Sequence, residues 1–132
     1  MGRQPLTIGI EEEFQIVRSD GELQAHIDTL LASARPILGE DVKAEMLQSV
    51  VEVGTRICGN VAEAREEVLR LRGTLASLLR PQDMRIVSAG THPFSHWRDQ
   101  RITELDRYKM IEDEMQDVVR ELLIFGMHVH VG

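Results

Sequence analysis

Two short stretches of the sequence place potential metal ligands two residues apart. Glu11 and Glu13 lie near the N-terminus, and His128 and His130 lie near the C-terminus. On a β-strand, residues i and i+2 point to the same face, so each stretch would present two ligands side by side. Burying like charges on one face is costly unless a cation compensates them. The spacing therefore predicts a cation-binding pocket that is built on strands.

A second pair of acids, Glu45 and Glu52, strengthens this prediction. Glu52 stands in a β-prone run of valines, where a solvated acid is less natural. Each feature alone has an ordinary alternative: a solvated strand face for Glu11 and Glu13, an outward-facing acid for Glu52, and a surface imidazole for either histidine. Taken together they favour a site, and carboxylates with imidazole but without cysteine suit Mg²⁺ or Mn²⁺ better than structural zinc.

Strands and helices that could position these residues are interspersed along the chain. The expected strands are residues 6–17, 23–26, 42–57, 84–89 and 127–131, with a turn at 19–22. The expected helices run from a cap at Asp28 to Leu38 before Gly39, from a capping box at Asn60 and Glu63 to Leu79, and from about 103 to 125. Residues 90–100, rich in Thr, His, Pro, Ser and Trp, are expected to form a loop.

The acidic strand at residues 6–17 decides the predicted fold class. Its charges alternate with apolar residues, so apolar layers cannot cover both of its faces. We therefore predict an α+β fold with a largely antiparallel sheet, helices packed on one face and the other face open to a site. The length is sufficient for a single domain over residues 1–132.

Composition excludes several classes of function. The chain carries 15 basic and 22 acidic residues, a net charge of −7, which argues against non-specific nucleic-acid binding. No apolar run approaches the roughly 20 residues of a membrane span, so no membrane partner is expected. Cys58 is the single cysteine, which rules out an intramolecular disulfide, fits a cytoplasmic location and favours a role as core filler over a catalytic thiol.

Four segments resemble successive signatures of one family, in its order and at similar spacing. They are residues 9–14 (GIEEEF), 48–55 (QSVVEVGT), 90–97 (GTHPFSHW) and 126–132 (GMHVHVG). The resemblance is to the carboxylate–amine ligases, often labelled glutamate–cysteine ligase type 2, within the glutamine synthetase-like superfamily. It extends over the whole chain and is therefore more specific than any single motif.

The resemblance implies an ATP-dependent ligase that uses Mg²⁺ or Mn²⁺. Such enzymes phosphorylate a carboxylate, usually the γ-carboxylate of glutamate, and an amine such as cysteine then attacks the acyl phosphate to form an amide. Phosphoryl transfer depends mainly on positioning and charge neutralisation, which agrees with metals held on a rigid strand platform.

The resemblance also implies roles for individual residues. Glu11 and Glu13 would bind different metal ions, while Glu12 would be structural. The other implied metal ligands are Glu45, Glu52 and His128, the two acids having substrate-ammonium contacts as their alternative role. The implied substrate- or nucleotide-binding residues are His130, Thr91 and His92, with the alternative that His92, next to Pro93, fixes the shape of its loop.

Family members are longer than this chain, and a strand pattern ends at Val131. We therefore expect the N-terminal part of a longer catalytic domain, without full activity alone. One alternative is a non-catalytic module for interaction or oligomerisation, since an unfinished sheet edge favours pairing with another chain, and a homo-oligomer stays open. Another is a different metal-dependent phosphotransferase or hydrolase; the absence of a Walker A loop argues against P-loop chemistry.

Overall fold

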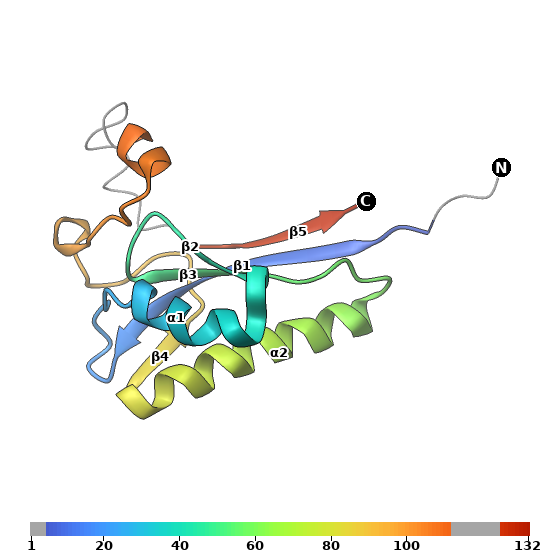
Figure 1. Cartoon of the computed structure of the whole chain (residues 1–132), viewed down its shortest axis with the longest axis horizontal. Coiled ribbons are helices and arrows are strands. Elements are labelled where there is room, and N and C mark those ends of the chain that lie inside the picture. The colour runs from blue at the N-terminus through green and yellow to red at the C-terminus, as the bar shows by residue number, and fades with distance from the viewer. Residues whose placement is uncertain (1–4, 112–124) are drawn as a thin grey trace.

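One long strand organises the sheet of this chain. The structure, a computed structural model, describes residues 5–111 and 125–132. β1 (Ile8–Arg18) pairs on one side with β3 (Val50–Gly54), and β2 (Val42–Ala44) adds beyond β3. On its other side, the first half of β1 pairs with β5 (Met127–Val131) and the second half with β4 (Met84–Val87). Every one of these pairings is antiparallel (Figure 1).

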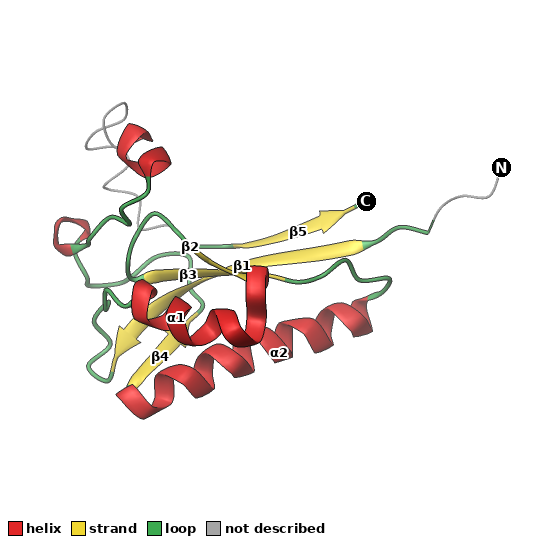
Figure 2. Cartoon of the chain, in the orientation of Figure 1, coloured by secondary structure: helices red, strands yellow, loops and turns green. Residues whose placement is uncertain are grey.

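Two helices, α1 (Ile27–Leu38) and α2 (Val61–Leu79), lie along one face of the sheet (Figure 2). Short 3₁₀ turns follow them at Gly39–Asp41 and Arg80–Gln82, and a third lies at Trp97–Asp99. The main core is formed between helices and sheet by buried side chains such as Phe14, Ile16, Leu30, Val51, Val53, Leu71, Leu75 and Leu79. This arrangement confirms the predicted α+β class with helices on one face of an antiparallel sheet. None of the helices among the described residues is long and apolar enough to cross a membrane.

The capping box predicted at the start of α2 is confirmed. The Asn60 side chain accepts a hydrogen bond from the backbone N–H of Glu63 at 3.0 Å. The Glu63 carboxylate in turn accepts from the backbone N–H of Gly59 at 2.8 Å. The first contact satisfies a donor that the first turn of a helix leaves unpaired, and the second holds Gly59, the residue before the cap, so the boundary is encoded locally.

Other boundaries differ from the sequence-based expectations. α1 begins after His26, so Asp28 is not its cap and lies in the first turn, where its charge favours the helix dipole. Residues 23–26 make only a single bridge, Leu23 to Val17, and are not a strand. The extended stretch 42–57 is divided into β2 and β3, and β4 is shorter than expected. The helix expected at 103–125 starts at Asp106, and residues 112–124 lie outside the described residues.

A buried ion pair fixes which face of β1 meets the helices. Glu12 is 2% exposed and accepts a hydrogen bond from Arg72 Nε on α2 at 2.9 Å. The same guanidinium lies 5.7 Å from the centre of the Phe14 ring. Since side chains alternate along a strand, this pairing sends Glu11 and Glu13 to the opposite, open face.

A candidate metal centre on the open face of the sheet

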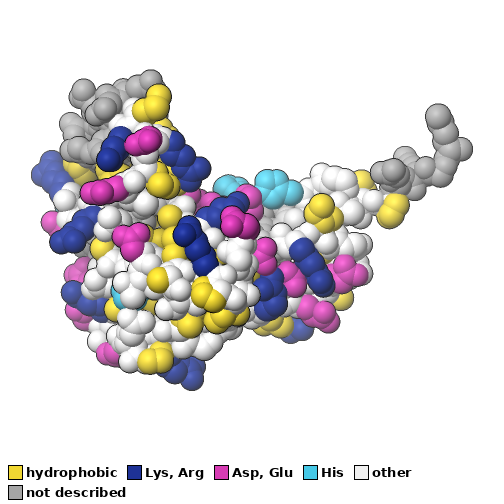
Figure 3. All heavy atoms as spheres, in the orientation of Figure 1, with side chains coloured by type: hydrophobic (Ala, Val, Ile, Leu, Met, Phe, Trp, Pro, Cys, Tyr) yellow, Lys and Arg dark blue, Asp and Glu magenta, His cyan; other side chains and the backbone are white. Residues whose placement is uncertain are grey.

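The strand register brings the predicted ligands together on the open face. Glu13 on β1 is directly opposite Glu52 on β3, and Glu11 is directly opposite His128 on β5. Directly opposed residues of an antiparallel pair point to the same face with neighbouring Cβ atoms. Figure 3 shows histidine side chains beside acidic ones on the surface above the sheet.

Glu45 joins this group from the segment between β2 and β3. Carboxylate oxygens of Glu13, Glu45 and Glu52 all lie within 4.8 Å of one another, and the three side chains are half-buried. We call these three residues the acidic cluster. Thr103 helps to hold the segment in place, because its hydroxyl donates to the backbone carbonyl of Glu45 at 2.5 Å.

Burial and mutual repulsion both disfavour the charged forms of Glu13 and Glu52. Burial raises the pKa of Glu13 and of Glu52, and repulsion from Glu45 raises both further. Carboxylates with raised pKa values at this spacing are what a bound cation would stabilise. Oxygen donors with imidazole nearby fit a hard divalent ion such as Mg²⁺ or Mn²⁺.

Glu11 and the two histidines form the neighbouring part of the site. His130 Nε2 lies 2.9 Å from Glu11 Oε2, and His128 Nδ1 lies 4.0 Å from the same oxygen. Glu13 accepts a hydrogen bond from the backbone N–H of Gly126 at 3.0 Å, immediately before β5. The cluster, Glu11 and the histidines thus occupy one continuous area, and it contains every residue predicted as a metal ligand.

Thr91 and His92 are not brought into this area. His92 is buried, and its Nδ1 accepts from the backbone N–H of Ser95 at 2.9 Å. Its Nε2 lies 2.8 Å from the carbonyl oxygen of Gly21, so both ring nitrogens are occupied in joining two loops. Thr91 is exposed. The loop approaches the site through Gly90, whose carbonyl accepts from the N–H of Phe125 at 3.2 Å.

Three residues near the acidic cluster were missed by the sequence analysis. Lys43 on β2 is opposite Glu52, with Nζ 3.9 Å from a carboxylate oxygen. Arg107 and Tyr108 line a recess together with Glu45 and Glu52. Periodicity places Tyr108 on the apolar stripe of a helix, and Lys43 requires the register of β2, which no local pattern specifies.

The fold is shared with solved ligase chains. The structure superposes on glutamate–cysteine ligase from Francisella tularensis in complex with AMP with a TM-score of 0.76 at 14% sequence identity, covering 100% of this chain and 28% of that one. It superposes on a bifunctional glutathione synthetase from Pasteurella multocida with a TM-score of 0.73 at 14% identity, covering 96% and 17% of the two chains. At such low identity these matches establish the fold alone, which this chain shares with part of each solved chain.

Sequence comparison identifies the family. The family model described as "Glutamate-cysteine ligase family 2 (GCS2)" matches residues 7–132. Relatives named "Putative glutamate–cysteine ligase 2" are 54% identical in Chloroflexus aggregans over 127 residues and in Roseiflexus castenholzii over 129 residues, 96% and 97% of this chain. The chain therefore belongs to glutamate–cysteine ligase family 2, and it spans about a third of the length of these relatives, 33% and 34%.

Proposed function

We propose that this chain supplies the metal-binding wall of an ATP-dependent carboxylate–amine ligase. Glutamate is the proposed carboxylate substrate, activated as an acyl phosphate on its γ-carboxylate, and an amine such as cysteine is the proposed acceptor. The observation that carries this proposal is the convergence of Glu13, Glu45 and Glu52 on one open sheet face, beside Glu11 and His128. Family membership and the fold shared with an AMP-bound ligase support it.

In this proposal the open face holds divalent ions, Mg²⁺ or Mn²⁺. The acidic cluster, Glu11 and His128 supply the ligands, with Glu11 and Glu13 on different ions. When bound, such ions neutralise charge on the nucleotide phosphates and on the transferred phosphoryl group. β1 and β3 keep the carboxylates at fixed spacing, which limits reorganisation during the reaction.

The remaining predicted residues take binding roles of different kinds. His130 adjoins Glu11 and would lie nearer the phosphates. The exposed Thr91 has a hydroxyl available for substrate. His92 uses both ring nitrogens within the protein, which favours its alternative role of shaping the loop that presents Thr91.

A metal titration tests the proposed centre directly. We expect Mn²⁺ affinity, measured by calorimetry, to fall at least about tenfold in Glu13→Gln and Glu52→Gln and further in the Glu11→Gln, Glu13→Gln double variant, because charged oxygen ligands are lost. Glu66→Gln, an exposed acid on α2, is the matched control. Affinity equal to that of the wild type in all three ligand variants would remove these acids from the site.

The proposed reaction needs its own assay. The chain would be joined to the remaining two-thirds of the Roseiflexus castenholzii relative, and phosphate release from ATP would be measured with glutamate and a panel of amines. We expect amine-stimulated, Mg²⁺-dependent release, reduced at least about a hundredfold by Glu13→Gln. Glutamate-independent hydrolysis with no amine effect would instead favour another metal-dependent phosphotransferase or hydrolase.

One observation favours a second candidate function, a module for interaction or oligomerisation. Within the described residues β5 pairs only with β1, so its other edge is open. The alternate side chains Met127, Val129 and Val131 are 51%, 59% and 65% exposed. An open strand edge beside exposed apolar side chains is a template for pairing with another chain.

A further inference from the structure

Lys43 extends a row of charged side chains across the open face. In the strand register, Lys43 on β2 is opposite Glu52 on β3, which is opposite Glu13 on β1. The three side chains therefore share one face of the sheet. Among ion pairs whose two members the structure describes, Lys43 is the one lysine or arginine that reaches the acidic cluster, at 3.9 Å from Glu52.

The Lys43 ammonium already does part of what a cation would do. Its charge opposes the repulsion that Glu45 and Glu11 exert on Glu52. It does so incompletely, because one positive charge at 3.9 Å faces the carboxylates of the acidic cluster. The lysine side chain is also 57% exposed, so solvent weakens its attraction to Glu52.

We propose that Lys43 is the resident counter-ion of the open face in the metal-free chain and that a divalent cation displaces its ammonium from Glu52. This inference rests on the metal centre of the proposed function. A divalent ion carries twice the charge of an ammonium and coordinates carboxylate oxygens directly. It therefore competes with Lys43 for the Glu52 carboxylate. A bound ion and a neighbouring ammonium repel each other, so occupancy by one lowers occupancy by the other.

The position of Lys43 permits this exchange without movement of the backbone. β2 is an edge strand of the sheet, and lysine carries its charge on a flexible four-carbon stem. Besides the recess at the acidic cluster, Lys43 lines a second recess, whose lining also includes Glu11, Glu40, Asp41 and His130. Asp41 is already paired with Arg70, so the exposed Glu40 and solvent are what could receive the displaced ammonium.

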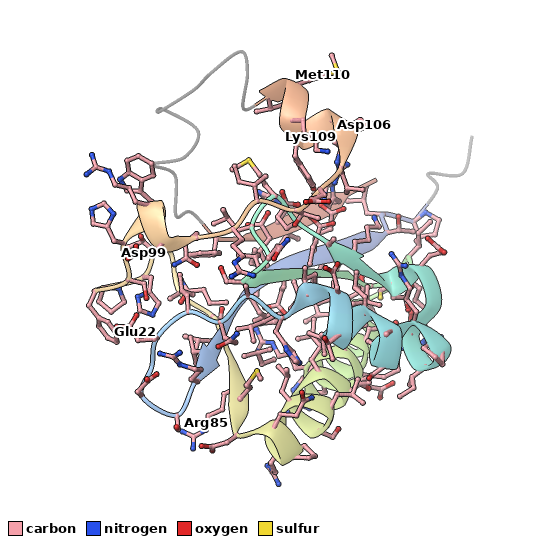
Figure 4. All side chains as sticks on the ribbon, turned by 60° about the vertical axis from the view of Figure 1, so that its left-hand side comes forward. Glu22, Arg85, Asp99, Asp106, Lys109 and Met110 are labelled. Carbon is pink, nitrogen blue, oxygen red and sulfur yellow. The ribbon has the colours of Figure 1, made fainter. Side chains whose placement is uncertain are left out.

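Mn²⁺ titration of lysine variants tests the proposal. The chain has two lysines, Lys43 and Lys109. Lys109 lies on the helical segment at 106–111 that Figure 4 shows with Asp106 and Met110, and it lines neither recess. We expect Lys43→Met to bind Mn²⁺ about threefold to tenfold more tightly than the wild type, because a repelling charge is removed. Lys43→Arg and the matched control Lys109→Met should stay within about twofold of the wild type.

Nuclear magnetic resonance provides a second readout on the intact wild-type chain. With two lysines, the two ε-methylene signals are assigned by the variants themselves. We expect Mg²⁺ to shift the Lys43 signal with the same midpoint as metal binding and to leave the Lys109 signal unchanged. Unchanged or weaker Mn²⁺ binding by Lys43→Met would overturn the role of Lys43 and leave the metal centre standing. Absence of binding in the wild type and both methionine variants would overturn the centre and this inference together.

Discussion

At the scale of single residues, the acidic cluster makes stability depend on pH in an unusual direction. The pKa values of Glu13 and Glu52 are raised above the usual 4.5, first by burial and then by Glu45. A carboxyl group with a raised pKa binds its proton more tightly in the folded than in the unfolded state. The stabilisation that this proton gives the folded state is complete at pH below about 4.5, the pKa of the unfolded chain. It is lost as the pH rises through the raised pKa of the folded chain.

Acids with lowered pKa values act in a separate pH window. Hydrogen bonding to Arg70 lowers the pKa of Glu67, so its stabilisation is complete above about 4.5 and is lost only as pH falls below that value. The range between 4.5 and neutrality therefore reports mainly on the acidic cluster among these carboxyl groups.

This separation leads to a prediction for the metal-free chain. Glu52→Gln should raise the free energy of unfolding by about 0.5 kcal/mol at pH 7.5, where the wild-type carboxylates repel each other, and should have less effect at pH 5. Urea unfolding at both pH values, with a chelator present, measures the difference. Glu66→Gln is the control for loss of an exposed charge. An equal effect of Glu52→Gln at both pH values would contradict the assigned repulsion.

Residue types and spacing were enough to predict which acids and histidines share the open face, but not all that surrounds them. Glu11 and Glu13 could be placed on one face from the sequence because a strand repeats every two residues. Lys43 is not visible, because its place opposite Glu52 depends on the pairing of two strands that are separated by a turn. The burial of His92 was equally hidden, since its partner Gly21 is 71 residues away.

At the scale of elements, sequence signals predicted the start of a helix correctly where contacts between neighbouring residues determine it. The box of Asn60 and Glu63 sets the start of α2 through hydrogen bonds within five residues. α1 instead starts where the N–H groups of His26 and Ile27 bond to the carbonyl of Gln48, a tertiary contact that outweighs the preference of Asp28 for a cap position. The prediction of a short strand at residues 23–26 was wrong for a similar reason. This segment is held by a hydrogen bond to Ser95 and by isolated backbone hydrogen bonds, not by a strand ladder.

The ion pair between β1 and α2 gives a prediction at this scale. Arg72→Met leaves the Glu12 carboxylate buried without its partner and should lower the free energy of unfolding by about 3 kcal/mol. The double variant Glu12→Met, Arg72→Met should recover most of that loss, because no uncompensated charge is left. Chemical denaturation of both, with the exposed Arg65→Met on α2 as control, measures these changes. A double variant as unstable as Arg72→Met would show that the unpaired Glu12 carboxylate is not the cause of the lost stability.

At the scale of the whole molecule, the helix face of the sheet is covered unevenly. α1 and α2 cover it beneath β1 and β3, whereas at β5 the same face presents exposed apolar side chains beside an open edge (Figure 1). The Chloroflexus aggregans relative is about three times as long as this chain, because the match covers 33% of its length. The proposed activity is therefore to be tested in a protein of the relatives' length.

The open edge predicts self-association of this chain when it is studied alone. We expect concentration-dependent dimers or larger species in sedimentation at about 100 μM, and a monomer after Val129→Lys and Val131→Lys, because charges on an edge strand oppose pairing. Leu69→Lys, which removes a 54% exposed apolar side chain from α2, is the matched control. A wild-type monomer at and below this concentration would exclude the oligomerisation module.

The hydrogen bond from Gly126 to Glu13 joins residues that are 113 positions apart. Contacts of such long sequence separation form late, because the intervening loop must close first. A nascent chain that has not yet released residues 126–131 from the ribosome lacks the part of the proposed centre that β5 supplies. The acidic cluster itself comes from β1, β3 and the segment before β3, so only the part of the cation affinity that β5 adds would report on closure of this long loop.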